Sequence, residues 1–262
     1  MDDLGTAATQ PTDPMPIVLL HGVGLDRTMW DAVRGVLGPG TVALDLPGHG
    51  GQPPLRAPQS LANLADDVLA RLPGGPVHLV GFSLGALIAQ HLARFHPDRV
   101  ATLTCVSSVC NRTAQEAAAV ATRLEAARRD FRGSVAASLQ RWFPKGSRVG
   151  AEAVTATERA LLANDVGSYL HAYAVFARGD REIAPELGRI RVPTLAMTGE
   201  LDPGSTPAMS RRLAAAVPGA RVQIVPGVRH MLPVEDAPAV AAAITAFTEE
   251  AMTAERAEAL RP

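Results

Sequence analysis

Residues 77–86 read VHLVGFSLGA, and this stretch decides the fold. Its first four residues, Val77–Val80, form a short apolar run typical of a buried strand, and a helical period begins at Leu84. A Gly-x-Ser-x-Gly turn centred on Ser83 joins the two. Its two glycines let the flanking backbones approach closely around a strained apex. The turn therefore predicts that Ser83 sits at a helix N-terminus, whose dipole favours a nearby negative charge.

The alternation of strand and helix continues along the chain. Short apolar runs predict five further strands at Ile17–Leu20, Val42–Leu46, Val100–Val106, Thr194–Thr198 and Arg221–Val225. Helical patterns occupy Arg27–Leu37, Ser60–Leu72, Leu84–Phe95, Pro207–Val217 and Ala237–Met252. The predicted strands are continuously apolar, as parallel strands covered on both faces are. We therefore expect an α/β fold with a doubly wound, mainly parallel sheet.

Residues 111–187 interrupt this alternation. They contain no convincing strand, and helical patterns occupy Ala114–Asp130, Val135–Phe143, Ala151–Leu162 and Ser168–Phe176. An excursion of this length exceeds an ordinary connection and is usually functional. We expect a helical cap, or lid, inserted into a core made of residues 16–110 and 188–252; the alternative is extra packing against the sheet. Residues 1–15 are expected to form a flexible leader and residues 253–262 a C-terminal tail.

Composition and charge exclude several classes of protein. Of the 262 residues, 47% are hydrophobic and 19% charged, which suits one large core and argues against intrinsic disorder. Because 25 Lys and Arg balance 26 Asp and Glu, no basic field exists to attract nucleic acid. No apolar run approaches the ~20 residues that span a bilayer, and no secretory signal is visible. Two cysteines, Cys105 and Cys110, are compatible with a reducing compartment, so we expect a cytoplasmic protein.

A nucleophilic serine needs a base, and the expected chain order after such a turn is acid, then histidine. His230 lies just beyond the last predicted strand and is the predicted general base and acid. The acid is expected in the segment GELD, residues 199–202, after the fifth predicted strand. Asp202 is favoured because a turn closed by Gly199 and held by Pro203 fixes its direction, with Glu200 as the competitor.

An oxyanion hole requires N–H donors that are already in place. Leu84 follows the nucleophile, and Val23 lies in the loop after the first predicted strand, so their backbone N–H groups are the predicted donors. His21 in the same loop is expected to brace it and not to react. His49, in the segment DLPGHG (residues 45–50), is assigned to a structural turn beside the mouth of the pocket.

Five motifs in this order resemble the α/β-hydrolase superfamily: HG after the first strand, DLPGHG, GFSLGA, GELD and the late histidine. The resemblance covers about residues 16–250. Within the superfamily the chain is most similar to 3-oxoadipate enol-lactonases and related small-molecule esterases. That similarity rests on LDRTMWD (25–31), RWF (141–143), YAVFARGD (173–180) and VPGARVQIVPGVRH (217–230). The leader before Ile17 is short for the antiparallel hairpin that usually opens this fold; the cap is expected after the sixth strand of the fold.

The resemblance implies a serine hydrolase that cleaves a small-molecule ester or lactone through an acyl-enzyme, with no metal or organic cofactor. An enol-lactonase of aromatic catabolism is one such enzyme. The alternatives are a C–C bond hydrolase or menaquinone-pathway-like lyase with the same triad, and a small-ligand receptor with vestigial hydrolysis. The predicted partner is a small-molecule ester or lactone, not a nucleic acid or a membrane, and a homodimer is left open.

A carboxylated substrate would need a cation in the pocket. Four arginines are candidates: Arg27 and Arg141, which we predict to bind substrate, then Arg178 and Arg229. Four aromatic residues of the insertion are predicted to supply an apolar wall: Trp142, Tyr169, Tyr173 and Phe176. We expect the helices near Trp142 and Tyr173 to roof Ser83, with at least one of the arginines pointing into the site.

Overall fold

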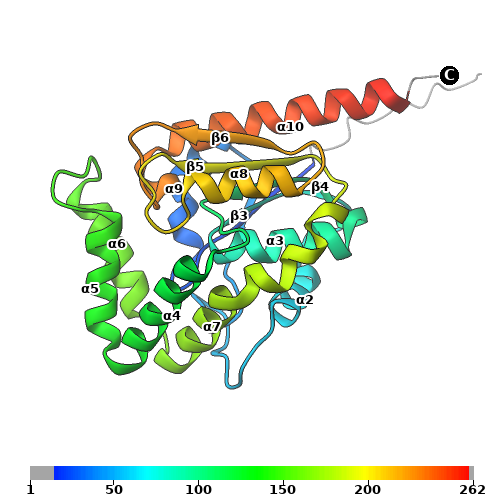
Figure 1. The fold of residues 1–262 in the computed structure, drawn as a ribbon. Helices are drawn as coiled ribbons and strands as arrows, with labels where there is room; N and C mark the ends of the chain where they lie inside the picture. Colours follow the sequence, from blue (N-terminus) through cyan, green and yellow to red (C-terminus); the bar gives the residue numbers. More distant parts are fainter. Residues whose placement is uncertain (1–14, 260–262) are drawn as a thin grey trace, which may run out of the picture.

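A computed structural model describes residues 15–259, which form a single sheet with helices on both faces (Figure 1). The six strands are β1 (Ile17–Leu20), β2 (Thr41–Leu44), β3 (Val77–Phe82), β4 (Val100–Val106), β5 (Thr194–Gly199) and β6 (Arg221–Val225). Their order is β2-β1-β3-β4-β5-β6, and every neighbouring pair is parallel. The predicted α/β fold is confirmed. The predicted leader, residues 1–15, lies outside the described residues except for Met15. The expectation about an opening hairpin before Ile17 concerns the same residues.

Three strands end at other residues than the sequence predicts, and β5 does so by a single residue, at Gly199. Strand β2 stops at Leu44 because the next residue, Asp45, turns its carboxylate onto the backbone N–H groups of Arg27 and Gly51. Strand β3 continues past Val80 to Phe82 because its last residues still pair with β4. Ser83 therefore follows the strand directly, and the turn around it contains no spare residue.

Helices cover both faces of the sheet. The core helices are α1 (Asp31–Leu37), α2 (Leu61–Arg71), α3 (Leu84–Phe95), α8 (Pro207–Ala216), α9 (Leu232–Glu235) and α10 (Ala237–Ala259). Short 3-10 helices η1 (Arg27–Trp30), η2 (Pro97–Arg99) and η3 (Ala184–Arg189) complete the set. Helix α10 continues past Met252 to Ala259, because the Ala- and Glu-rich sequence there favours a helix over the predicted tail.

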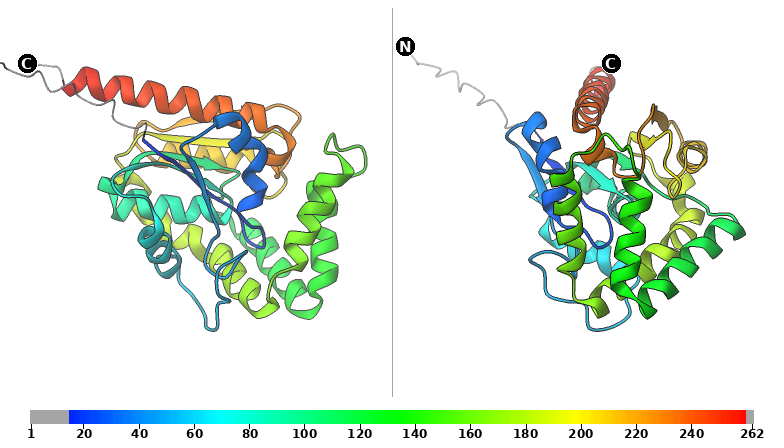
Figure 2. Two further views of the ribbon diagram at one scale, coloured as in Figure 1. Left: turned by 180° about the vertical axis from the view of Figure 1, so that it is seen from behind. Right: turned by 90° about the vertical axis from the view of Figure 1, so that its left-hand side faces the viewer.

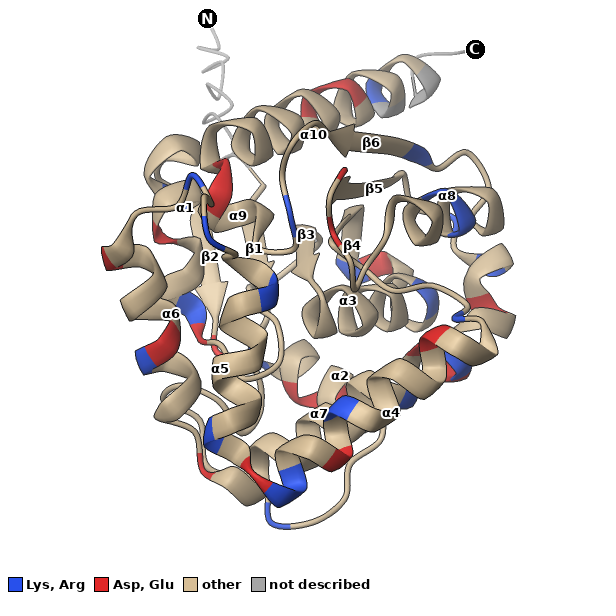
Figure 3. Ribbon diagram, turned by 60° about the vertical axis from the view of Figure 1, so that its left-hand side comes forward, with Lys and Arg blue, Asp and Glu red and all other residues tan. Residues whose placement is uncertain are grey.

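The core is divided into two layers by the alternation of side chains along each strand. Val18 and Leu20 of β1 belong to the cluster formed with α2, α3 and α8, whereas Leu19 points to the cluster formed with α1 and α10. No strand except β6 carries a charged residue, and Figure 3 shows the charges on the surrounding helices and loops. Each fully buried Leu contributes roughly 1.5–3 kcal/mol through the hydrophobic effect.

The predicted insertion, residues 111–187, is helical and follows β4, the fourth strand of the described sheet. It contains α4 (Ala114–Arg129), α5 (Phe131–Trp142), α6 (Ala151–Leu162) and α7 (Val166–Ile183), which lie together beside one end of the sheet (Figures 1 and 2). Thr113 and Glu116 form a capping box at the start of α4, and Asp130 and Asp165 cap α5 and α7. The latter caps explain why α5 and α7 begin before the residues that periodicity predicts.

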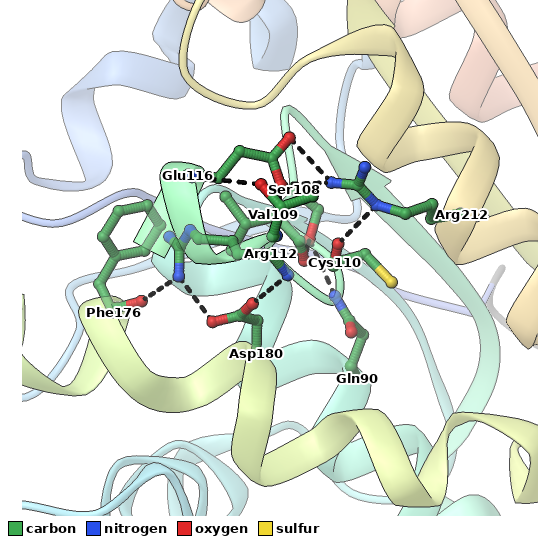
Figure 4. A network of polar contacts seen from close by, with 10 residues as sticks. Gln90, Ser108, Val109, Cys110, Arg112, Glu116, Phe176, Asp180 and Arg212 are labelled. Carbon is green, nitrogen blue, oxygen red and sulfur yellow. Dashed lines mark hydrogen bonds and ion pairs between the residues drawn. The ribbon is translucent and has the colours of Figure 1, made fainter. Parts of the chain in front are cut away.

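A polar network joins the two ends of the insertion to each other and to the core (Figure 4). The carboxylate of Asp180 in α7 accepts hydrogen bonds from the backbone N–H of Arg112 at 2.8 Å and from its Nη1 at 2.6 Å. Both side chains are buried, with exposed fractions of 2% for Arg112 and 1% for Asp180. The Arg112 guanidinium also lies 4.6 Å from the centroid of the Phe176 ring. Nearby, Arg212 of α8 pairs with Glu116 of α4 at 2.8 Å.

Removing one partner of this pair should strongly destabilise the protein. In Asp180→Asn the charge of Arg112 stays buried without a counter-charge, so we expect the free energy of unfolding to fall by about 3–5 kcal/mol. Urea denaturation measures this loss. The matched control is Asp31→Asn, which breaks the exposed Arg34–Asp31 pair and should cost less than about 1 kcal/mol. Equal small losses in the two variants would contradict the assigned importance of the buried pair.

No helix within residues 15–259 combines the length and the apolar character needed to cross a membrane.

Candidate active site

The candidate site lies where the carboxyl ends of the central strands meet the insertion. In open parallel sheets, ligands bind at the carboxyl edge near the point where strand order reverses, which here is β1 and its neighbour β3. A cavity of about 620 Å³, counting its open mouth, occupies this position. The core contributes Val23, Ser83, Asp202, Pro203, Gly204, Ser205 and His230 to its wall. The insertion contributes Arg123, Ser138, Arg141, Trp142, Tyr169, Tyr173 and Phe176.

Ser83 occupies the turn between β3 and α3 with a φ of 53°, a left-handed conformation that is strained for a residue with a side chain. Its backbone N–H donates to Val106 O at 3.0 Å, which ties the turn to β4. The two flanking glycines are required by space. A Cβ at Gly81 would overlap the Gly85 carbonyl, and one at Gly85 would overlap the carbonyls of Leu20 and His21. The turn therefore forms only with glycine at both positions.

His230 follows β6, and its imidazole is held by Asp202, which follows β5. Asp202 Oδ2 lies 2.7 Å from His230 Nδ1. Because an ionised carboxylate only accepts, Nδ1 carries the proton and Nε2 remains free to accept one. The rings of Phe82 and Trp142 pack on the imidazole at centroid distances of 5.0 and 5.6 Å. His230 and Ser83 line the same cavity.

The two acidic residues of the segment GELD have different positions. Asp202 Oδ1 accepts hydrogen bonds from the backbone N–H groups of Gly204 at 2.8 Å and Ser205 at 2.9 Å, which fix the carboxylate toward His230. Glu200 points elsewhere, because its Oε2 accepts from the backbone N–H of Gly227 at 3.0 Å. Of these two carboxylates, the structure brings only Asp202 to the imidazole.

A residue not singled out from the sequence holds the loop that carries His230. The Glu235 carboxylate accepts a hydrogen bond from the backbone N–H of Arg229, at 3.1 Å from each oxygen. Burial raises the pKa of Glu235, and the backbone hydrogen bond from Arg229 opposes that shift. The His230 carbonyl accepts from Ser107 Oγ at 3.0 Å. The sequence around Glu235 predicts no partner for its carboxylate. Only the folded loop brings the N–H of Arg229 to it.

Two backbone N–H groups near Ser83 have no acceptor within residues 15–259. Leu84 is the first residue of α3, and Val23 lies in the loop after β1 and lines the cavity. The loop around Val23 is fixed by a hydrogen bond from Leu25 N–H to Gly22 O at 3.2 Å. Asn164 of the insertion also donates to Gly24 O at 2.8 Å. Free donors at the nucleophile are what an oxyanion hole requires.

His21 and His49 are buried beside this loop. His21 Nδ1 donates to Gly22 O at 2.7 Å, and its Nε2 accepts from the backbone N–H of Leu46 at 2.8 Å, so both ring nitrogens are used. His49 Nδ1 donates to Pro47 O at 3.0 Å. Their rings meet edge to face at 5.2 Å. Burial lowers the pKa of His21 to about 3 and that of His49 to about 4. Both imidazoles are therefore neutral supports of the loops.

This pair predicts how stability depends on pH. Unfolded histidines bind protons near pH 6.5, whereas folded His21 and His49 resist protonation, so unfolding takes up protons below that pH. The free energy of unfolding should therefore fall as the pH decreases from about 6.5 toward 4. Each histidine adds a slope that approaches about 1.4 kcal/mol per pH unit. Urea denaturation at pH 7, 6 and 5 measures the slope.

His21→Gln is the matched variant, because an amide can make both hydrogen bonds without titrating. It should lose about half of the slope contributed by the pair. An identical slope in the wild type and this variant would overturn the assignment.

The structure separates the predicted substrate-binding residues. Arg141, Trp142 and Tyr173 line the cavity. Arg27 does not, because its Nη1 pairs with Asp45 at 3.0 Å and the side chain is 59% exposed. Arg178 is exposed on α7, and Arg229 lines a separate shallow groove. Arg27 is close in sequence to the loop after β1, but the carboxylate of Asp45, with which it pairs, lies 18 residues away along the chain.

Other cavity residues were not found from the sequence. Arg123 and Ser205 line the wall, and the buried Ser205 Oγ has no hydrogen-bond partner among residues 15–259. The sequence contains 24 arginines, and nothing near Arg123 in the sequence distinguishes it from the others on helical patterns. Within residues 15–259, no three His, Cys, Asp or Glu side chains are grouped so as to hold a metal ion.

Comparison with known proteins identifies the family to which the chain belongs. Residues 17–244 match the model of the alpha/beta hydrolase family, so the protein belongs to that family. It is 31% identical over 225 residues to an (E)-2-((N-methylformamido)methylene)succinate hydrolase of Acinetobacter baylyi, covering 83% of this chain and 84% of the relative. It is 32% identical over 232 residues to a pimeloyl-[acyl-carrier protein] methyl ester esterase of Edwardsiella ictaluri, covering 82% and 85%.

Among solved structures, an enol-lactonase from Burkholderia xenovorans superposes with a TM-score of 0.79 at 25% sequence identity. The match covers 89% of this chain and 91% of the enol-lactonase. These relatives are hydrolases and esterases of the same fold.

Proposed function

We propose that the protein is a serine hydrolase that cleaves a small carboxylic ester or lactone through a covalent acyl-enzyme. One observation carries the proposal. Ser83 and His230 line a single cavity, and Asp202 binds the Nδ1 proton of that histidine so that Nε2 is free to act as a base. The ester, lactone and amide-type substrates named for the relatives support a reaction at a carbonyl carbon.

The first half of the reaction forms the acyl-enzyme. Ser83 Oγ attacks the carbonyl carbon while His230 Nε2 takes the hydroxyl proton, and the carbonyl π pair moves onto the oxygen. That oxyanion accepts hydrogen bonds from the N–H groups of Val23 and Leu84. Asp202 stays ionised and stabilises the imidazolium. The ester C–O bond then breaks, and His230 gives its proton to the leaving oxygen.

The second half releases the acid. Water attacks the acyl carbon while His230 Nε2 takes one of its protons, and the tetrahedral intermediate collapses by breaking the bond to Ser83 Oγ. His230 returns the proton to that oxygen, which regenerates the hydroxyl. With a lactone, the leaving hydroxyl stays on the product. Trp142 and Tyr173, on α5 and α7, roof the cavity and give these steps a partly water-free setting, which is the role we assign to the insertion as a lid.

Ser83→Ala tests the nucleophile. We expect kcat for a p-nitrophenyl ester to fall by roughly 10⁴–10⁶ because members of a triad act as a unit. The wild type should also show a burst of nitrophenol equal to the number of sites and lose activity to a fluorophosphonate that labels Ser83. Circular dichroism and urea denaturation verify that the variant is folded. A variant that keeps a tenth of the wild-type rate would overturn the assignment.

The two neighbouring carboxylates provide a matched pair. Asp202→Asn removes the group that sets the imidazole tautomer and should lower kcat about 10⁴-fold. Glu200→Gln keeps an oxygen that can accept from Gly227, so its kcat should change by less than about threefold. Comparable losses in both variants would contradict the assignment of the acid.

A C–C bond hydrolase or lyase would use the same triad, and a receptor would bind without turnover. Rates measured in parallel on an ester, an enol-lactone and a vinylogous diketone separate these alternatives from the proposed esterase. Preference for the diketone would overturn the ester assignment, and binding without turnover of any of the three would overturn hydrolysis.

A further inference from the structure

We propose that Arg123 and Arg141, together with the phenols of Tyr169 and Tyr173, form a binding site for a carboxylate group of the substrate. This inference rests on the proposed hydrolase function and adds the chemical class of its substrate: a small ester or lactone that carries a second, ionised carboxyl group. The four residues line the cavity that contains Ser83.

Arg141 is oriented but has no counter-charge. Its Nη1 donates to Ala137 O at 3.0 Å and its Nη2 to Ser138 Oγ at 2.7 Å, so the guanidinium is held by its own helix. Ser138 Oγ in turn donates to Ser134 O at 2.9 Å, which directs its lone pairs toward the arginine. Three of the five N–H groups of an arginine then remain for a ligand.

Arg123 reaches the same cavity from the facing helix α4. Within the described part of the chain its side chain forms no hydrogen bond and no ion pair, although it is partly buried. Burial lowers the pKa of Arg141, and the positive charge of Arg123 lowers it further. The groups that oppose this shift are the two phenols, with no carboxylate among them.

The acids close to the cavity are already engaged, because Asp202, which lines it, binds His230, and Asp180 pairs with Arg112. Both carboxylate oxygens of Asp180 accept hydrogen bonds from Arg112. Arg112 lies close enough to Arg123 for the two positive charges to repel each other, and Asp180 neutralises the charge of Arg112. Within the described residues, two guanidiniums thus face one cavity without a carboxylate partner. Two partly buried like charges without a counter-ion are costly, and an anionic ligand removes that cost.

The phenols complete the site. Tyr169 and Tyr173 are buried, with exposed fractions of 4% and 7%, and neither hydroxyl takes part in a hydrogen bond among residues 15–259. Burial raises the pKa of Tyr169, so its phenol stays protonated and can donate. Planar guanidiniums and phenol donors suit a carboxylate, which accepts several hydrogen bonds in one plane. The core thus supplies the reacting groups, and the insertion supplies the groups that select an anion.

Matched pairs of esters test the proposal. Mono-p-nitrophenyl succinate and p-nitrophenyl butyrate have acyl chains of equal length and differ in the terminal carboxylate. In a second pair, 4-acetoxybenzoate and phenyl acetate, the charge is on the leaving group. Arg123→Gln and Arg141→Gln should each lower kcat/KM for the anionic ester of at least one pair by about 10–100-fold, mainly through KM. The neutral esters should change by less than about threefold.

Arg178→Gln is the matched control, because it removes one positive charge from the exposed surface of α7. It should leave all four rates unchanged. Unchanged discrimination between anionic and neutral esters in both cavity variants would overturn the carboxylate site while leaving the hydrolase intact.

Direct binding separates the two proposals. Titration calorimetry of succinate against the Ser83→Ala protein reports the anion site without turnover. Binding that weakens by about 10-fold or more when Arg141→Gln is added supports the site, even if the wild type hydrolyses none of the esters, an outcome that overturns only the proposed function. Absence of succinate binding together with undiminished rates on the anionic esters in both arginine variants would overturn the site.

Discussion

One steric constraint organises the molecule: β3, α3 and the loop after β1 meet at Gly81 and Gly85 with no room for a Cβ atom. This contact forces the chain to reverse within a single residue and places Ser83 in a left-handed conformation. The strain is tolerated because β3 is buried at every residue inside a parallel sheet, so that the backbones on either side of the turn cannot move apart. The other site residues lie in loops at the same carboxyl edge of the sheet as this turn.

The histidine and its acid come from loops that are fastened to each other as well as to the sheet. Glu200 and Glu235 accept backbone N–H groups on either side of Val228, while Leu201 N–H donates to Val228 O at 2.9 Å. Glu200 and Glu235, which do no chemistry in the proposed reaction, thereby help to fix the positions of Asp202 and His230. The two glutamates act here as the groups around a metal site do, which orient the metal ligands by hydrogen bonds without binding the metal.

The sequence predicts those parts of the protein that depend on local spacing. The strand, the glycines and the serine of the turn are neighbours in the chain, and the strands and most helices follow from apolar periodicity. Asp202 could be preferred over Glu200 because the turn between Gly199 and Pro203 is also local. Arg123 could not be found, because its place in the cavity depends on how α4 packs against α5. Arg27 stays outside the cavity for the same reason: its partner Asp45 follows β2, and only the folded sheet brings the two residues together.

The insertion is attached unevenly, and this bears on how a substrate enters. The buried Arg112–Asp180 pair joins its beginning to its end, and the Arg212–Glu116 pair joins its beginning to the core. At the far end, between α5 and α6, it meets the core through apolar side chains and one 3.4 Å hydrogen bond from Arg148 to Gly227 O. Apolar contacts have no preferred direction and allow sliding, whereas separating a buried ion pair is costly. Any opening motion should therefore pivot about α7 and part the wall near Arg148. The residence time of a product would then be governed by residues that neither bind nor cleave it.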